Sequence, residues 1–438
     1  MEKTARSIVA RLRDRGYIAY FAGGCVRDIV RGQVPKDFDI ATNARPEEVQ
    51  AIFPRTHAIG AHFGVILVVE NTFQFEVATF RSDGVYLDGR HPVEVHFSSA
   101  EEDAKRRDFT INGMFYDPLN EQVIDYVGGR ADIAAELVRA IGDAGQRFVE
   151  DRLRMLRAVR FATTLNYEID PATWDALAAS AHSIKEISAE RIREELVRIF
   201  VSANRVRGWD LLDRSGLMRA VLPELEAMKG CLQPEQFHPE GDVFQHTRLM
   251  LKLLPEKKVS APLVFAVLFH DIGKPRTAAV DETGRIRFNA HDRIGAEMTE
   301  AVMERLRFSR AEIEDTVEMV RQHMVFKDVP NMRVAKLKRF MARPTFGDEL
   351  ELHRVDCASS HRMMENYDFL VQKKEEFANE PIIPPPLVRG DDLIALGLKP
   401  GPKFGEILEA IETQQLEGTL RDREEALAWV KRQYLSNA

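Results

Sequence analysis

Two aspartates separated by one residue lie in the stretch "GGCVRDIVRGQVPKDFDIAT", which runs from Gly23 to Thr42. On a β-strand Asp37 and Asp39 face the same side, because side chains alternate, and Phe38 faces the other. Adjacent carboxylates repel each other, and a cation between them removes that cost. Magnesium prefers such oxygen ligands and keeps substrate phosphates in its shell. An isolated Asp-x-Asp pair is also typical of ordinary surface charge, so the pair alone does not establish a metal site.

A pair of glycines precedes the aspartates. Gly23 and Gly24 stand between a predicted strand, residues 17–23, and a predicted helix, residues 25–32. Glycine lets the backbone approach a phosphate closely, and a helix N-terminus presents free N–H groups to an anion. Arg27, one turn into the helix, is a bidentate phosphate donor. Glycines and aspartates together predict a site that holds a polyphosphate at one end and metal ions at the other.

The surrounding elements form an α/β region that gives way to helices. Further strands are predicted at residues 37–42, 64–70 and 72–81, and a helix at residues 46–53 begins with Pro46. From about Gly142 onward helical periodicity dominates. The stiff connector "PIIPPP" precedes a last helical segment. The pattern predicts an α/β head followed by a long all-helical body.

Length and composition limit the class of protein. A chain of 438 residues is expected to form two to four domains, and 45% apolar with 30% charged residues is typical of a globular protein. The longest apolar run, Ala261–Phe269, is too short to span a bilayer, so we expect no membrane segment. Three distant cysteines favour the reducing cytoplasm over a disulfide framework. The net charge of −8 excludes nucleic-acid binding by the whole surface and leaves local patches.

The order of the motifs resembles the signature of polymerase-β-type nucleotidyltransferases, specifically the class II tRNA nucleotidyltransferases (CCA-adding enzymes) and bacterial poly(A) polymerases. After "GGCVRD" and "KDFDIAT" come "RRDFTIN" (Arg106–Asn112), "EDRLRMLRAVRF" (Glu150–Phe161) and "ISAERIREEL" (Ile187–Leu196). The resemblance implies a polymerase-β-type nucleotidyltransferase head and an extended all-α body that includes an HD-type helical domain. The implied division is a head (1–140), a nucleotide-selecting and RNA-binding neck and body (141–235), an HD-type domain (236–370) and a helical RNA-binding tail (371–438).

The resemblance also implies roles for residues of the head. Asp37 and Asp39 would hold two magnesium ions between the 3′-hydroxyl of a tRNA and an incoming CTP or ATP. Glu76 is the candidate third carboxylate, with an ion pair to Arg81 as the alternative. Three further residues match the loop that reads the ribose 2′-hydroxyl: Arg107 and Asp108 as the reading groups and Asn112 as their support.

The segment "EDRLR" suggests how a base is chosen. Asp151 and Arg154 are three residues apart on a predicted helix and therefore share a face. An aspartate only accepts hydrogen bonds and an arginine only donates them, which suits the amine and ring nitrogen of cytosine or adenine. Uracil and guanine place a carbonyl at the amine's position, a mismatch that costs about 1–3 kcal/mol. Arg157 and Arg160 continue the series and are expected to touch base or phosphate, or to form an exposed basic face.

Two segments bear on which relative this chain resembles most. Residues 80–108 contain a loop that CC-adding enzymes lack, and residues 59–69 lack the arginine-rich form of bacterial poly(A) polymerases. Both favour addition of the full CCA sequence. An A-adding or CC-adding partial enzyme and a poly(A) polymerase remain the alternatives.

A histidine-rich region follows the H…HD…D order of the HD phosphohydrolase superfamily. Its candidate ligands of a second divalent metal centre are His246, His270, Asp271 and Asp356, with His291 and His323 to complete two metal positions. Such a centre would activate water against phosphoesters at RNA ends, and it is either an additional activity or the main one. The alternative is an HD fold kept as a helical scaffold.

Two more segments are candidates for RNA contact. Residues 320–344 carry seven basic residues against one acidic residue, and "LGLKPGPKFGEIL" places Gly401 and Gly405 at a helix start. A solvated basic face and a plain helix entry are the respective alternatives. A purely RNA-binding scaffold is disfavoured by the complete set of acidic and basic motif residues, and the oligomeric state is left open.

Overall fold

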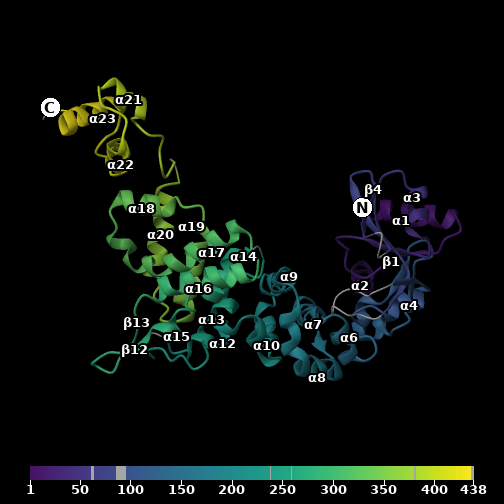
Figure 1. Ribbon diagram of the computed structural model, residues 1–438. Helices are drawn as coiled ribbons and strands as arrows, with labels where there is room; N and C mark the ends of the chain where they lie inside the picture. Colours follow the sequence, from purple (N-terminus) through teal and green to yellow (C-terminus); the bar gives the residue numbers. More distant parts are fainter. Residues whose placement is uncertain (61–63, 85–94, 237, 258, 379–380, 436–438) are drawn as a thin grey trace. The chain divides into compact units, whose positions relative to one another are not determined.

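The computed structural model describes residues 1–438 apart from 61–63, 85–94, 237, 258, 379–380 and 436–438 (Figure 1). The described chain forms two compact units. The first is Met1–Glu226 with Arg305–Phe308, and the second is Ala227–Glu304 with Ser309–Ala438. The division into four parts expected from the sequence is finer than this and stays a prediction. The loop expected within residues 80–108 lies largely outside the described residues, as does part of segment 59–69.

A seven-stranded mixed sheet forms the centre of the head, in the order β3-β4-β5-β2-β1-β8-β9. Its strands are β1 (Ala19–Ala22), β2 (Asp39–Thr42), β3 (Thr56–Gly60), β4 (Val65–Glu70), β5 (Phe73–Thr79), β8 (Phe115–Asp117) and β9 (Gln122–Ile124). Strand β2 pairs antiparallel with β1 and parallel with β5, so it is held on both sides. The predicted strands are confirmed. Strand β2 begins only at Asp39, however, so Asp37 lies just before the strand.

Short helices and a small second sheet complete the head. The helices are α1 (Glu2–Asp14), α2 (Gly24–Val30), α3 (Pro46–Ile52), α4 (Ala100–Lys105) and the 3₁₀ turn η2 (Thr110–Asn112). Strands β6 (Arg81–Asp83) and β7 (Val95–Phe97) pair with each other. Helix α1 buries Ile8, Val9 and Leu12 on one face, which is the helical spacing seen in the sequence. Gly23 caps α2 with φ 73°, a conformation that a side chain would strain.

Helices follow the sheet in the rest of the first unit. They are α5 (Gly129–Ala134), α6 (Ala144–Glu150), α7 (Leu153–Leu165), α8 (Pro171–Ser180), α9 (Ala189–Phe200), α10 (Arg205–Arg214), α11 (Leu217–Val221) and α12 (Pro223–Glu226). Helix α7 packs against α9 and α10. Its buried residues include the charged Arg154, which therefore needs polar partners inside the fold.

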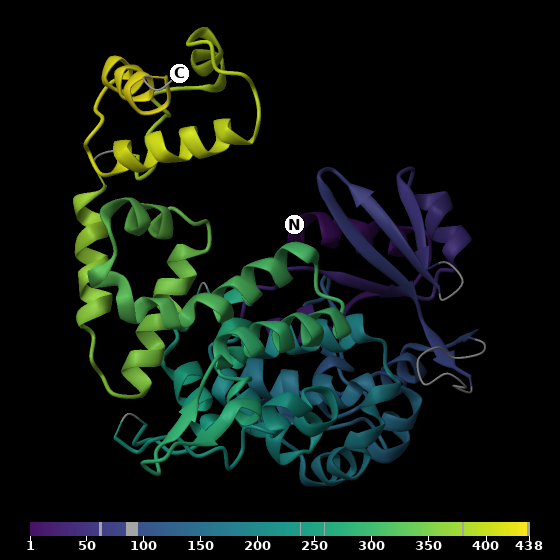
Figure 2. The same ribbon diagram turned by 60° about the vertical axis from the view of Figure 1, so that its left-hand side comes forward.

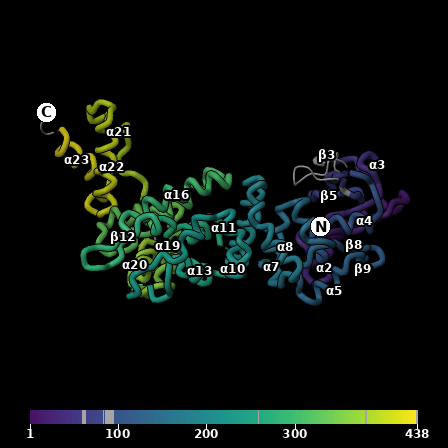
Figure 3. The backbone as a smooth tube through the Cα atoms, turned by 60° about the horizontal axis from the view of Figure 1, so that its bottom comes forward, coloured from purple at the N-terminus to yellow at the C-terminus, as the bar shows by residue number. Residues whose placement is uncertain are grey.

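The second unit is mainly helical (Figure 2 and Figure 3). Its helices are α13 (Val243–Leu253), α14 (Ala261–Phe269), α15 (Lys274–Thr277), α16 (His291–Arg305), α17 (Arg310–Gln322), η4 (His323–Asn331), α18 (Val334–Met341), α19 (Phe346–Ser359), α20 (Glu365–Glu376), α21 (Gly390–Ala395), α22 (Pro402–Leu416) and α23 (Arg423–Val430). Helix α14 is apolar all round because α13, α17 and α19 pack against it. Among the described residues, no helix combines the length and apolar character needed to cross a membrane.

The expectation of a purely helical body is wrong at two places among the described residues. In the first unit, β11 (Glu168–Ile169) pairs in parallel with β10 (Leu137–Val138). The second place is in the second unit. Strands β12 (Ala278–Val280) and β13 (Ile286–Phe288) form an antiparallel hairpin between α15 and α16. Its turn is held by Asp281, whose Oδ1 accepts from the backbone N–H groups of Thr283 and Arg285, and Gly284 adopts φ 81°. Asp and Gly in these positions are ordinary turn residues, a signal that the helical periodicity on either side concealed.

A substitution at Gly129 tests how tightly the protein is packed behind the candidate site. A Cβ at Gly129, the first residue of α5, would lie 2.3 Å from the carbonyl oxygen of Thr110 in η2. We expect Gly129→Ala to lower the free energy of unfolding by about 2 kcal/mol, because a backbone atom cannot move aside easily. Urea unfolding followed by circular dichroism measures this. The control is Gly347→Ala in α19, where nothing lies within 4 Å; a Gly129→Ala value no lower than that of the control would contradict the expectation.

Candidate active site and candidate metal centre

Three carboxylates gather at the end of β2. Ile40 of β2 pairs with Val77 of β5, so one residue earlier Asp39 stands beside Glu76. Asp39 is exposed to solvent, yet the protein around it desolvates the carboxylate enough to raise its pKa to about 6. The neighbouring charges of Glu76 and Asp37 raise the pKa further, and Arg107 opposes them. The structure therefore places Asp39 beside Glu76 and within electrostatic range of Asp37, but the three are not among the groups of described residues whose ligand atoms all lie within 4.8 Å of one another. Their oxygen donors suit a divalent cation, and metal binding by them stays a prediction.

The glycine turn before α2 faces the same carboxylates. A Cβ at Gly23 would lie 3.4 Å from Nη1 of Arg107 and 3.8 Å from Oδ2 of Asp39. A Cβ there would make only ordinary contact with these groups, and it is the φ of 73° that favours glycine at this turn. Arg107 is held in place by Asp103, to which it donates two hydrogen bonds of 2.9 and 3.2 Å. Gly23, Arg107 and Asp39 thus converge.

Arg27, which the sequence predicts to bind phosphate, has protein partners in the structure. Its Nε and Nη2 donate to Oδ1 of Asp28 at 3.0 and 2.9 Å, and its Nη1 donates to Oδ1 of Asn112 at 2.9 Å. The guanidinium also lies over the ring of Phe161. In this structure Arg27 ties α2 to η2, because two polar neighbours already match its planar set of donors. A contact with phosphate stays a prediction, and Gly24 beside it is the first residue of α2.

Asp108 is buried and already paired. Its Oδ2 accepts from Nε of Arg157 at 2.8 Å, and its Oδ1 accepts from the backbone N–H of Phe109 at 2.8 Å and more weakly from Nδ2 of Asn112. Burial alone would raise the pKa of Asp108, but the charge of Arg157 overrides it and holds the pKa below the ordinary value. The pair ties the head to α7. Reading of a ribose hydroxyl by Asp108 stays a prediction.

The expectation that Asp151 and Arg154 share a helix face is wrong. Asp151 ends α6 in an extended conformation (φ −145°, ψ 103°), and α7 begins only at Leu153. The Oδ1 atom of Asp151 accepts from the backbone N–H of Leu153 at 3.0 Å. Short aspartate side chains make such local bonds and break a helix at that point, a competition that periodicity does not reveal.

Each of these two residues has its own partner. Arg191 of α9 donates to both carboxylate oxygens of Asp151, at 3.2 and 2.8 Å. Arg154 donates to Oε2 of Glu150 at 2.5 Å and to the carbonyl of Arg106 at 3.3 Å. Arg191 and Glu150 were missed by the sequence argument, although both lie inside the motifs "EDRLR" and "ISAERIREEL".

The remaining arginines of α7 follow the same pattern. Arg160 donates to Glu195 at 2.5 Å and lies over the ring of Phe161. Helix α9 therefore supplies Arg191 to Asp151, just before α7, and Glu195 to Arg160 within α7. The alternative of an exposed basic face is wrong, because Arg154, Arg157 and Arg160 each meet a carboxylate.

The six candidate ligands of the HD centre come together in the second unit. His246 lies on α13, His270 and Asp271 follow α14, His291 starts α16, His323 follows α17, and Asp356 lies on α19. Nε2 of His246 lies 3.1 Å from Oδ1 of Asp356, and Nε2 of His270 lies 3.0 Å from Oδ2 of Asp271. All four imidazoles are buried. The structure thus assembles two overlapping ligand groups that share Asp271.

The geometry of His291 and His323 fits a cation between them. Each ring directs its Nδ1 to a backbone carbonyl, which only accepts, so Nδ1 is the donor and Nε2 is the nitrogen left to face a ligand position. The two Nε2 atoms lie 3.2 Å apart and face Oδ1 of Asp271, at 3.4 Å from His291. Burial, with added repulsion from His270, lowers the pKa of His323 to about 4, so the ring is neutral. Lone pairs that converge on a carboxylate fit a metal ion.

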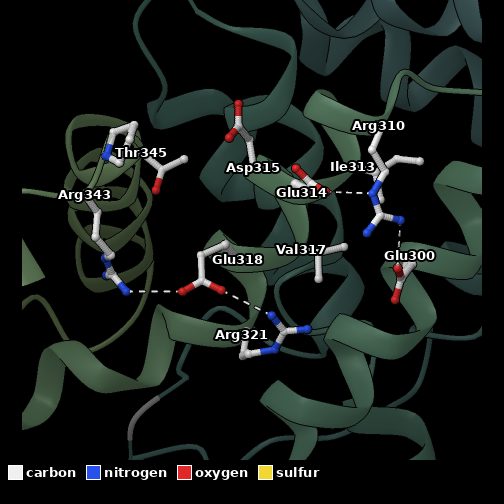
Figure 4. Close-up of a pocket in the computed structure, with 11 residues that line it drawn as sticks. Glu300, Arg310, Ile313, Glu314, Asp315, Val317, Glu318, Arg321, Arg343 and Thr345 are labelled. Atoms are coloured by element: carbon white, nitrogen blue, oxygen red, sulfur yellow. Dashed lines mark hydrogen bonds and ion pairs between the residues drawn. The ribbon is translucent and has the colours of Figure 1, made fainter. Parts of the chain in front are cut away.

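A cleft elsewhere in the second unit contains part of the basic segment 320–344 (Figure 4). Arg321 and Arg343 both reach Glu318, at 3.2 and 3.4 Å, and Arg310 reaches Glu300 and Glu314. These arginines are compensated by acids, so their charge is not free for phosphate at this cleft. RNA contact by the rest of the segment stays a prediction.

Family models match four successive parts of the chain. They are the poly A polymerase head domain over residues 19–139, the "probable RNA and SrmB-binding site of polymerase A" over 166–229, the HD domain over 243–358 and tRNA nucleotidyltransferase domain 2 over 362–430. The family resemblance expected from the motifs is confirmed.

Curated relatives match about half of the chain. The CCA-adding enzyme of Geobacillus stearothermophilus is 43% identical over 222 residues, which cover 50% of this chain and 54% of that protein. The CCA-adding enzyme of Streptococcus uberis is 44% identical over 201 residues, which cover 46% and 50%. The chain therefore spans about half the length of the curated relatives it matches.

Solved structures match over nearly the whole chain. The CCA-adding enzyme of Bacillus stearothermophilus in complex with CTP has a TM-score of 0.74 and 26% identity, and covers 99% of this chain and 97% of that chain. The Thermotoga maritima CCA-adding enzyme complexed with tRNA has a TM-score of 0.61 at 19% identity, covers 98% and 94%, and shows the fold alone. The fold class is confirmed as a polymerase-β-like head with a mixed sheet, followed by a helical body with an HD domain.

The buried Asp108–Arg157 pair gives a pH-dependent prediction. We expect Asp108→Asn to lower the free energy of unfolding at pH 7 by about 2 kcal/mol, because Arg157 loses its buried counter-charge. The folded-state pKa of Asp108 lies below its ordinary value of 3.8, so the pair stabilises the fold above that pH and its contribution fades as pH falls further. In urea unfolding, the gap between parent and variant should narrow from pH 5 to pH 3. Asp14→Asn, on the exposed part of α1, is the control, and an Asp108→Asn curve that overlays it would contradict the prediction.

Proposed function

We propose that this chain, a member of the tRNA nucleotidyltransferase and poly(A) polymerase family, adds C, C and A to the 3′ end of tRNA from CTP and ATP without a nucleic-acid template. The observation that carries the proposal is the cluster of Asp37, Asp39 and Glu76 beside Gly23 and Arg107. The relatives named CCA-adding enzymes support this choice within the family. We also infer the four-part division of the chain and a cytoplasmic location.

The carboxylates are proposed as the metal ligands. Asp37, Asp39 and Glu76 would hold magnesium, whose oxygen preference matches the donor set. When bound there, magnesium would activate the RNA 3′-hydroxyl and stabilise the leaving pyrophosphate. Arg107, held by Asp103, directs its remaining positive charge toward the same point, where it would bind the phosphate or ribose of the nucleotide. The turn at Gly23 leaves room for that group.

We propose that Asp151 and Arg154 select the base while each keeps the partner that it has in the structure. Arg191 keeps Asp151 ionised and acceptor-only, and Glu150 holds the Arg154 guanidinium. An exocyclic amine of C or A would donate to the aspartate, and the adjacent ring nitrogen would accept from the arginine. The carbonyl of U or G would face the aspartate instead, at a cost of about 1–3 kcal/mol. Arg157 and Arg160, which pair with Asp108 and Glu195, would support this pocket.

We further propose a metal-dependent phosphohydrolase activity in the second unit. The convergent lone pairs of His291 and His323 at Asp271 favour this over a purely structural HD fold. His246, His270, Asp271 and Asp356 would hold one ion, and Asp271, His291 and His323 a second. Their mixed nitrogen and oxygen donors suit transition metals as well as magnesium. When bound, such ions would activate water toward 2′,3′-cyclic or terminal phosphates of RNA.

Nucleotide addition is tested with three tRNA substrates, ending before CCA, after C and after CC. With magnesium, CTP and ATP, we expect each to be completed to CCA and extended no further. Asp37→Asn should lower the rate at least 10³-fold because one of the metal ligands loses its charge. The exposed Glu47→Gln of α3 is the matched control and should keep the parent rate.

The products of these reactions also distinguish full CCA addition from the alternative activities. Long A tails from ATP alone would indicate a poly(A) polymerase, and C without A would indicate a CC-adding enzyme. Addition of A only to the substrate that ends in CC would indicate an A-adding enzyme. No extension of any substrate would contradict the proposal as a whole.

The HD activity is tested on an RNA that ends in a 2′,3′-cyclic phosphate, with manganese, nickel, cobalt or magnesium supplied in turn. We expect Asp271→Asn to lower hydrolysis at least 100-fold, because Asp271 belongs to both ligand groups. Nucleotide addition should persist in this variant. Asp315→Asn, an exposed residue of α17, is the control. Hydrolysis that survives in Asp271→Asn, or none in the parent with any metal, would favour the scaffold interpretation.

A further inference from the structure

Three of the four histidines in the HD centre are oriented by the same kind of local hydrogen bond. Each directs Nδ1 to the backbone carbonyl three residues earlier, which is a short hydrogen bond within its own segment. The pairs are His270 with Val267 at 3.0 Å, His291 with Phe288 at 2.8 Å and His323 with Val320 at 2.6 Å. His270 and His323 follow the ends of α14 and α17, where the last carbonyls have no helical partner and are free to accept.

His246 has no such carbonyl to use. It lies inside α13, and the carbonyl three residues earlier, that of Val243, accepts from Oγ1 of Thr247 at 3.0 Å. Its Nδ1 instead lies 2.6 Å from Oε1 of Glu240. The hydroxyl of Ser359 is a more distant neighbour of the same nitrogen, at 3.4 Å. A carboxylate thus takes the place that backbone carbonyls take at the other three rings.

Glu240 is itself held by a second histidine. Its side chain is 8% exposed, and Oε1 also lies 2.9 Å from Nδ1 of His238. The rings of His238 and His246 meet edge to face, with centroids 5.0 Å apart. The other oxygen, Oε2, is buried and has no hydrogen-bond partner among the described residues. Because two imidazoles are its hydrogen-bond partners, the carboxylate acts on the orientation of His246.

We propose that Glu240 is a positioning residue for metal binding at the HD centre, and that His238 holds Glu240 in place. By accepting from Nδ1 of His246, Glu240 fixes the ring so that its Nε2 faces Asp356, 3.1 Å away, where a metal ion would replace the proton between them. A carboxylate partner also makes the imidazole a stronger ligand than a backbone carbonyl does. The proposal rests on the metal centre inferred above. It adds two residues, in "FHPEGDVFQHT", that lie outside the H…HD…D pattern.

Metal affinity tests the proposal independently of any reaction. Manganese is titrated calorimetrically into the full-length chain, with Asp37→Asn in every sample so that the head carboxylates contribute little. We expect Glu240→Gln to weaken the tightest binding step 10- to 100-fold, because the amide keeps the shape but loses the charge. Glu240→Asp should recover part of the loss, and His238→Gln should weaken binding less than Glu240→Gln. Glu235→Gln, an exposed residue of the same segment, should bind like the parent.

Two readouts separate positioning from a structural role. The rise in melting temperature on adding manganese, measured for each variant from its own metal-free value, should be smaller in Glu240→Gln than in the parent and in Glu235→Gln. The absorption spectrum of the cobalt-loaded chain should change in Glu240→Gln and not in Glu235→Gln. Tight binding that Glu240→Gln leaves unchanged would overturn the proposal and keep the metal centre. If the parent binds no metal and Asp271→Asn behaves identically, both the positioning role of Glu240 and the metal centre itself are contradicted.

Discussion

Repulsion among Asp37, Asp39 and Glu76 is the constraint on which the head depends. Three carboxylates stay together only because β2 is hydrogen-bonded on both sides, to β1 and β5, and cannot move its first residue away from Glu76. Desolvation raises the pKa of Asp39, and the charges of Glu76 and Asp37 raise it further. Under the proposed function, a divalent cation would relieve this repulsion. Arg107, close to the turn at Gly23, already opposes it.

Pairs of opposite charge join the helices next to the head to one another, and one of them, Arg157 with Asp108, joins α7 to the head. Along α7, Arg154 meets Glu150, Arg157 meets Asp108 and Arg160 meets Glu195, while Arg191 of α9 meets Asp151. Each guanidinium is fixed by planar hydrogen bonds, so little freedom remains to be lost when a nucleotide binds. Under the proposed function such rigidity would matter, because selection between bases would rest on one donor and one acceptor.

Much of this arrangement could be predicted from the sequence, and the failures share one cause. Periodicity and glycine positions located β1, β2, β4 and β5 of the head. The common side of Asp37 and Asp39 stays a prediction, because Asp37 precedes β2. The H…HD…D order located the second centre. The partners of the charged residues were not predicted: Arg27 bonds Asn112, 85 residues away in the chain, and Arg157 bonds Asp108, 49 away. Spacing within one segment carries no information about such pairings. Asp151 was misplaced because a side-chain bond to Leu153 ended the helix.

The charge balance of the chain follows from these pairings. A net charge of −8 already argued against binding RNA with the whole surface. The structure adds that many arginines serve internal carboxylates, in the first unit along α7 and in the second unit at Arg310, Arg321 and Arg343. These arginines stabilise the fold by pairing with carboxylates, so little of their positive charge is left to attract a phosphate from solvent. Under the proposed function, contact with RNA would then rely on the remaining cations and on the head site, where a metal ion held by the carboxylates would attract phosphate.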